Sequence, residues 1–142
     1  MGYQDNRSDI TKYIDDTFPT TIIEQDNVAY EDDQGFTIPT DKPWIRVIIK
    51  NIDTNFADIG FPQKTMKRFG MLMIQVFVQE DGGTDLMMQI LDQLVTTFEG
   101  VQLASGLLFR EVKPREAGFI EGWQQANVNI EFDIRESITI VN

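Results

Sequence analysis

The residue types available for catalysis are few in this chain, and carboxylates dominate them. The 142 residues include 23 Asp and Glu but no cysteine and no histidine, which excludes a Ser-His-Asp triad, a thiolate nucleophile and the commonest zinc ligands. Two carboxylates can hydrolyse a glycosidic bond, and Glu116 and Glu121 lie close in sequence to Trp123. Because pairs of acids arise by chance among 23, we expect no enzyme and keep a two-acid glycosidase only as the competing hypothesis.

Two turns have compositions that occur in ligand sites, but neither has the spacing that such a site needs. Residues 80–83, Glu-Asp-Gly-Gly, lead from a predicted strand into a helix, where phosphates often bind. No lysine follows the glycines, and the flanking acids would repel a phosphate. Asp32 and Asp33 are a candidate cation loop, but the oxygen spacing of a calcium site is missing. We therefore predict no cofactor and no metal site.

The net charge of −11 bears on the partners of the protein. Binding to the phosphate backbone through a basic groove needs clustered Lys and Arg, so the acidic balance disfavours it. Such a charge keeps a protein in solution, and an acidic wall also lets DNA slide past without sticking. No apolar run reaches the roughly 20 residues of a membrane-spanning helix, and the N-terminus lacks the apolar core of a signal peptide. We expect a soluble protein with no membrane partner.

Two segments have the periodicity of amphipathic helices, residues 5–18 and 85–99. Pro19 disfavours continuation of the first helix, and Gly100 supplies a stop for the second. Each helix has one apolar face that must be buried. The apolar positions are Ile10, Tyr13, Ile14 and Phe18 in the first helix, and Met87, Ile90, Leu91, Leu94 and Phe98 in the second.

Strands are predicted over residues 44–52, 67–79, 107–112 and 123–134, with a short extended segment at 27–30. The 67–79 segment is apolar on both faces, which is typical of a central strand covered on both sides, or by a helix on one side and a partner on the other. From Ala126 on, the last strand alternates between apolar and polar residues, so one face is buried and the other is wet.

Residues 53–65 are predicted to form a long connection, because they include Gly60 and Pro62. Three large apolar residues in this connection pack either on the parent domain or on a neighbouring subunit. Three of the 12 Lys and Arg lie beside them. If the protein assembles, we expect these residues at an interface with an acidic partner or a neighbouring copy, although an exposed strand entrance explains the cations equally well. The candidate interface residues are Phe56, Ile59, Phe61, Lys64, Lys67 and Arg68.

The order of elements predicts an α+β fold with a single mixed or antiparallel sheet of about four to five strands and helices on one face. No internal repeat or linker is visible, so residues 1–142 are expected to form one domain. Residues 1–4 and 136–142 are expected to be extended arms, and residues 113–118 either extend a strand or form a turn. The apolar tail 138–141 either frays or pairs with another segment.

A pattern of strand and turn residues extends over residues 27–100. It begins with Asn27-Val-Ala-Tyr30, continues through Pro43-Trp44-Ile-Arg-Val47 and Lys67-Arg68-Phe69-Gly70, and ends with Gly83 and the helix that reaches Phe98. In this pattern, which covers about half of the chain, the protein resembles the tail terminator (tail completion) proteins of long-tailed bacteriophages.

The resemblance implies a structural virion protein that forms a hexameric ring of α+β protomers. Such a ring caps the tail tube at its head-proximal end, stops tube polymerisation and joins the tube to neck or head-completion proteins. DNA then passes through the ring lumen without sequence-specific binding, and assembly takes place in the host cytoplasm. The alternative within this class is another head-tail connector, neck or tail-tube-like subunit. The segment 138–141 has no counterpart in the family pattern.

Overall fold

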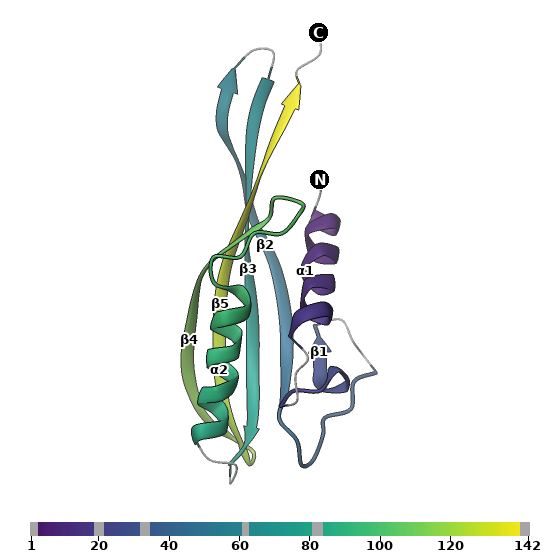
Figure 1. The fold of residues 1–142 in the computed structure, drawn as a ribbon, viewed down its shortest axis with the longest axis vertical. Helices are drawn as coiled ribbons and strands as arrows, with labels where there is room; N and C mark the ends of the chain where they lie inside the picture. The colour runs from purple at the N-terminus through teal and green to yellow at the C-terminus, as the bar shows by residue number, and fades with distance from the viewer. Residues whose placement is uncertain (1–2, 19–21, 32–34, 61–62, 81–83, 140–142) are drawn as a thin grey trace.

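The computed structural model places two helices on one face of a five-stranded sheet (Figure 1). It describes residues 3–18, 22–31, 35–60, 63–80 and 84–139, with backbone alone for residues 3–6, 51–60, 63–66, 84 and 135–139. The helices are α1 (Tyr3–Thr17) and α2 (Thr84–Phe98), and a short 3-10 turn spans Gln25–Asn27. The strands are β1 (Val28–Tyr30), β2 (Trp44–Gly60), β3 (Gln63–Gln79), β4 (Leu108–Ile120) and β5 (Trp123–Thr139). The predicted α+β class is confirmed.

The sheet is mixed, in the order β1-β2-β3-β5-β4. Only β1 and β2 are parallel, and the other neighbouring strands are antiparallel. β3 lies in the centre, between β2 and β5, and pairs with β5 along its full length, from Gln63 opposite Thr139 to Gln79 opposite Trp123. The prediction of a central strand at this position is therefore confirmed.

The core lies between the helices and one face of the sheet. In β3, the side chains of Leu72, Ile74, Val76 and Val78 on this face are fully buried. All nine predicted helix-face positions are buried except Tyr13, which is half-buried. The Tyr13 ring joins the two helices, since its centroid lies 5.6 Å from that of Phe98 in an edge-to-face arrangement. The predicted apolar faces of both helices are thus confirmed.

Leu91→Asp should prevent folding, because Leu91 is 6% exposed within the core. The change removes about 1.5–3 kcal/mol of apolar burial and places a carboxylate in the apolar core, which adds several kcal/mol. Circular dichroism and gel filtration should show an unfolded or aggregated chain. Gln89→Asp, an exposed change on the same helix, is the matched control and should fold normally. A soluble Leu91→Asp variant with unchanged melting would contradict this packing.

The predicted connection at residues 53–65 is wrong, since β2 continues to Gly60 and β3 begins at Gln63. Together the two strands form one long hairpin. The register shifts between Asn51 and Asp53 and again between Phe56 and Asp58. Each shift interrupts the alternation of side chains between the two faces, so the apolar residues of this segment lose the period of two by which a strand is detected in a sequence.

The predicted ends of the chain also need correction. Tyr3 and Gln4 belong to α1, and residues 136–139 belong to β5, where they pair with β3. Residues 3–4 are therefore helical and not extended, residues 136–139 are extended but paired, and residues 1–2 and 140–142 lie outside the described residues. Of the two readings of residues 113–118, extension of a strand is the one observed, because β4 runs on to Ile120.

Candidate functional site

β2, β3 and β5 project beyond the helices at one end of the molecule (Figure 1). β2 and β3 have 17 residues each, about 56 Å at the usual rise of a strand, whereas the 15 residues of each helix span only about 22 Å. The helices therefore cannot cover the full length of the sheet. We call the projecting part, residues 52–60, 63–66 and 135–139, the arm. Its strands are held by continuous pairing of β3 with β2 and β5.

The structure brings five of the six predicted interface residues onto this hairpin. Phe56 pairs with Met66, and Ile59 pairs with Lys64, within the arm. Phe61 lies outside the described residues. Lys67 and Arg68 follow on β3 at the base of the arm and, as neighbours in a strand, point to opposite faces of the sheet. Phe56, Ile59 and Lys64, which were predicted to lie in a connection, thus lie on paired strands, and Lys67 and Arg68 lie on a strand as predicted.

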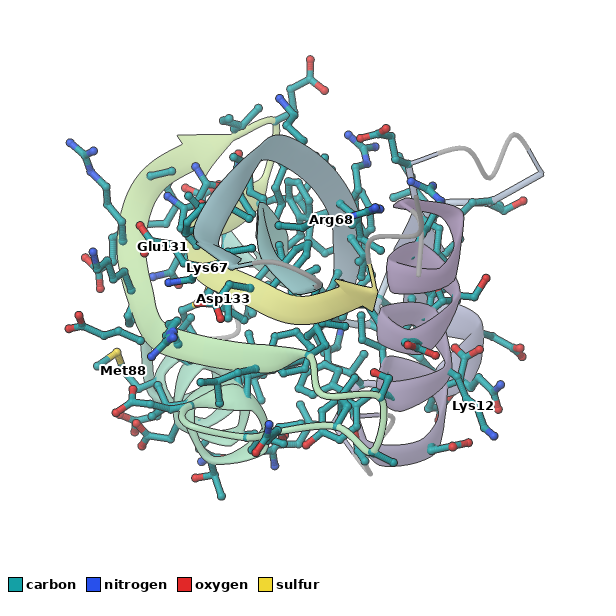
Figure 2. All side chains as sticks on the ribbon, turned by 90° about the horizontal axis from the view of Figure 1, so that it is seen from above. Lys12, Lys67, Arg68, Met88, Glu131 and Asp133 are labelled. Carbon is teal, nitrogen blue, oxygen red and sulfur yellow. The ribbon has the colours of Figure 1, made fainter. Side chains whose placement is uncertain are left out.

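A buried carboxylate connects three strands at the base of the arm (Figure 2). Asp133 of β5 is 7% exposed and accepts hydrogen bonds from Arg110 of β4, at 2.6 Å from Nε to Oδ2 and 3.2 Å from Nη2 to Oδ1. The Nζ of Lys67 on β3 lies 3.9 Å from the same Oδ2. The Asp133 carboxylate raises the pKa of the Arg110 guanidinium, chiefly through these hydrogen bonds. Asp133 therefore joins β3, β4 and β5 at the point where β3 and β5 continue into the arm.

The sequence did not reveal this cluster. Asp133 occupies a position predicted to be wet, and its burial depends on Arg110, which comes from another strand. Lys67 also lies over the ring of Phe69, with Nζ 4.8 Å from the centroid. Its ammonium group thus contacts an acid and an aromatic ring of its own chain, while Lys67, Arg110 and Glu131 line a groove of about 620 Å³ beside the arm.

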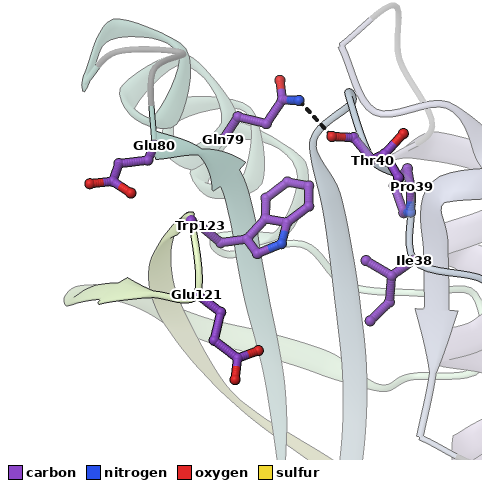
Figure 3. Close-up of a pocket in the computed structure, with 8 residues that line it drawn as sticks. Ile38, Pro39, Thr40, Gln79, Glu80, Glu121 and Trp123 are labelled. Atoms are coloured by element: carbon purple, nitrogen blue, oxygen red, sulfur yellow. Dashed lines mark hydrogen bonds between the residues drawn. The ribbon is translucent and has the colours of Figure 1, made fainter.

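A hollow of about 770 Å³ lies at the opposite end of the sheet and includes part of the hypothetical glycosidase site (Figure 3). Glu121 and Trp123 line it, together with Glu80 and the segment from Ile38 to Thr40. The side-chain amide of Gln79 donates a hydrogen bond of 2.9 Å to the Thr40 carbonyl oxygen across the hollow. Glu116 does not line it, because it lies on β4 opposite Ala126. The two acids of the glycosidase hypothesis are therefore not brought together around Trp123.

The described residues contain no group of three or more acidic side chains placed to hold a metal ion. Asp32, Asp33, Gly82 and Gly83 of the two candidate ligand turns lie outside these residues. Among the helices that the structure describes, none is long and apolar enough to span a membrane.

A family model and several solved structures match the chain. The model of a family described as phage tail terminator protein matches residues 9–131. One solved structure is 17% identical in sequence and has a TM-score of 0.67, covering 94% of this chain and 96% of that chain. At this identity the likeness shows the fold alone. No curated protein matches the chain.

Proposed function

We propose that this chain, which belongs to the phage tail terminator family, forms a ring of six copies that caps the head-proximal end of the tail tube. The family is structural and non-enzymatic, so the chain is a component of the virion tail that interacts with the tail tube. In the proposed role, the ring ends tube polymerisation and binds the neck or head-completion proteins on its other side.

The arm is the observation that supports this proposal most directly. Nine of the 17 residues of β2 and four of the 17 residues of β3 lie in the arm, which extends past the helices toward neighbouring copies or the tube (Figure 1). A projecting, continuously paired hairpin is stiffer than a loop of equal length, because its backbone hydrogen bonds are already made. Contacts with neighbours then need little additional ordering, which favours assembly. We place Phe56, Ile59, Phe61, Lys64, Lys67 and Arg68 at this interface.

The acidic balance of the chain fits a ring through which DNA moves. A net charge of −11 per copy is repeated six times in a ring, and a negative potential keeps the phosphate backbone from adhering to the wall. DNA would therefore pass through the lumen without sequence-specific contacts.

A polymerisation assay tests the capping function. Tail-tube protein from the same phage is allowed to polymerise with increasing amounts of the chain, and tube lengths are measured by negative-stain electron microscopy. We expect tubes to shorten at a low molar ratio of the chain to tube protein, because one ring is enough to cap each tube end. Tube lengths that stay unchanged at an excess of the chain would contradict capping. Labelling of the chain in complete phage would separate a terminator from a neck or connector subunit by its axial position.

Reversal of the charge at Arg68 tests the arm base as an interface. Arg68→Glu should weaken ring formation and capping about tenfold, because a like charge then faces an acidic partner. Lys12→Glu makes the same charge change at an exposed position of α1 and should leave capping unchanged. Thermal melting of both variants shows that the body is intact. Capping by Arg68→Glu at the wild-type level would remove Arg68 from the interface.

A further inference from the structure

The sheet face that points away from the helices concentrates positive charge in an acidic chain. Cross-strand partners share a face, and the buried core residues identify which face this is. Among the Lys and Arg whose side chains the structure describes, six lie on it. Three carboxylates, those of Glu111, Glu131 and Asp133, line the groove at the end near the arm. Glu80 and Glu121 line the hollow at the opposite end, so the cations outnumber the carboxylates chiefly between these two ends. The six cations are Arg46, Lys50, Lys67, Arg110, Lys113 and Arg115.

Four of these cations form two rows, and the floor between the rows is part apolar and part polar, carrying Met71, Met73 and Gln75 of β3 and Asn127, Asn129 and Glu131 of β5. Arg46 and Lys50 lie on β2, and Lys113 and Arg115 lie on β4, with β3 and β5 between. Three strand spacings separate the rows, about 14 Å. Met71 and Met73 of β3 are half-buried on the floor. We call Arg46, Lys50, Met71, Met73, Lys113 and Arg115 the open face. An α-helix with its side chains is about 10–12 Å wide and fits between the rows.

The outer side of α2 has the complementary chemistry. Asp85, Asp92 and Glu99 are exposed and are spaced by seven residues, so they lie along one line of the helix, about 10 Å apart. α2 contains no Lys or Arg. Met88 lies between the first two acids and is 46% exposed, pointing away from the molecule (Figure 2). The line of acids complements one row of cations, and Met88 matches the methionines of the floor.

We infer that the open face of one copy binds the outer side of α2 of the next copy. The inference rests on the proposed ring and specifies the contact that builds it. Because the two surfaces differ, the contact is head-to-tail, and such contacts close into a ring when the rotation between copies permits. Within the described residues, both helices pack on the other face of the sheet, so no helix of the same copy occupies the open face.

DNA is the competing occupant, because clustered cations also bind phosphates. Two observations favour a second copy. The half-buried methionines between the cation rows suit an apolar protein contact and offer nothing to a phosphate backbone. The same chain also carries an acidic helix with an exposed methionine, whereas its overall charge of −11 repels DNA at a distance.

Two charge-reversed variants test the contact, one on each side. The first is Lys113→Glu/Arg115→Glu on the open face. The second is Asp92→Lys/Glu99→Lys on α2, where lysine near the helix C-terminus is favourable for folding. Each variant alone should assemble at least tenfold more weakly than wild type in light scattering, with an unchanged melting temperature. An equimolar mixture should recover assembly, because alternating copies restore opposite charges at every contact.

Each outcome decides the inference. Recovery in the mixture, after failure of each variant alone, supports it, and weaker wild-type assembly at high salt should accompany this result. Wild-type assembly by either variant alone, or a mixture that fails like its components, overturns it. If the Lys113→Glu/Arg115→Glu variant forms normal rings but no longer binds DNA, the open face binds DNA and not a second copy. If the wild-type chain never associates, with or without tail-tube protein, the proposed ring fails and this contact fails with it.

Discussion

Gly70→Ala should lower the free energy of unfolding by about 3 kcal/mol or more, because Gly70 leaves space for an aromatic ring of the neighbouring strand. Gly70 of β3 lies directly opposite Phe132 of β5. A Cβ atom at this position would lie 2.6 and 2.7 Å from the two Cε atoms of that ring and closest of all to its Cζ. Phe132 is 1% exposed and belongs to the core, where its ring lies edge-to-face with Phe109. The ring would therefore have to shift against the packed core to admit the new methyl group.

Thermal unfolding measures this effect. For a chain of this size, 1 kcal/mol corresponds to about 2–4 °C, so the melting temperature should fall on the order of 10 °C. The double variant Gly70→Ala/Phe132→Leu is the control, because the shorter side chain makes room for the new methyl group. The double variant should be more stable than the sum of the two single changes predicts. A Gly70→Ala protein that melts within about a degree of wild type would show that the ring does not fill this space.

Removal of the arm should abolish capping while the body remains folded. In this variant a two-residue Asn-Gly turn replaces residues 56–66 and joins Asn55 to Lys67, which face each other across the hairpin. The described core side chains come from residues 10–49 and 72–134, so the melting temperature should change little. Capping should fall by at least tenfold, and tubes should grow as long as they do without the chain.

A turn substitution at the other end of the sheet provides the matched control. Glu121 and Gly122 form the turn between β4 and β5 with positive φ angles of 49° and 85°, which Asn-Gly adopts readily. Glu121→Asn should therefore fold and cap normally. Capping by the arm-deleted variant at the level of this control would show that the arm is not the functional surface.

Both helices could be predicted from the sequence because the pattern of apolar residues that marks their buried faces lies within each helix itself. The apolar residues of each helix recur within three or four positions, and the same residues form the core in the structure. The central strand was recognisable because both of its faces are apolar. The strands of the arm were not, because two shifts of register interrupt the side-chain alternation of β2. Beyond Val112, β4 is an edge strand whose residues are exposed on both faces, so it has no alternating pattern to detect.

For the candidate interface, the sequence predicted which residues cluster but not the secondary structure that carries them. The sequence showed that apolar residues and cations cluster near residues 56–68, and the structure places this cluster on a hairpin. The link between Asp133, Arg110 and Lys67 and the fit of Phe132 over Gly70 were not predictable, because each depends on register between strands far apart in the chain. The same holds for the two rows of cations on the open face, whose four members come from two strands that are not neighbours.

The mass of the protein in solution, alone and with tail-tube protein, tests the central claim most directly. Light scattering should give a species of six copies, about 98 kDa from six chains of 16.3 kDa, either for the chain alone or once tube ends are present. A mass of 16.3 kDa under both conditions, with no chain bound to tubes, would contradict the ring and with it the proposed capping.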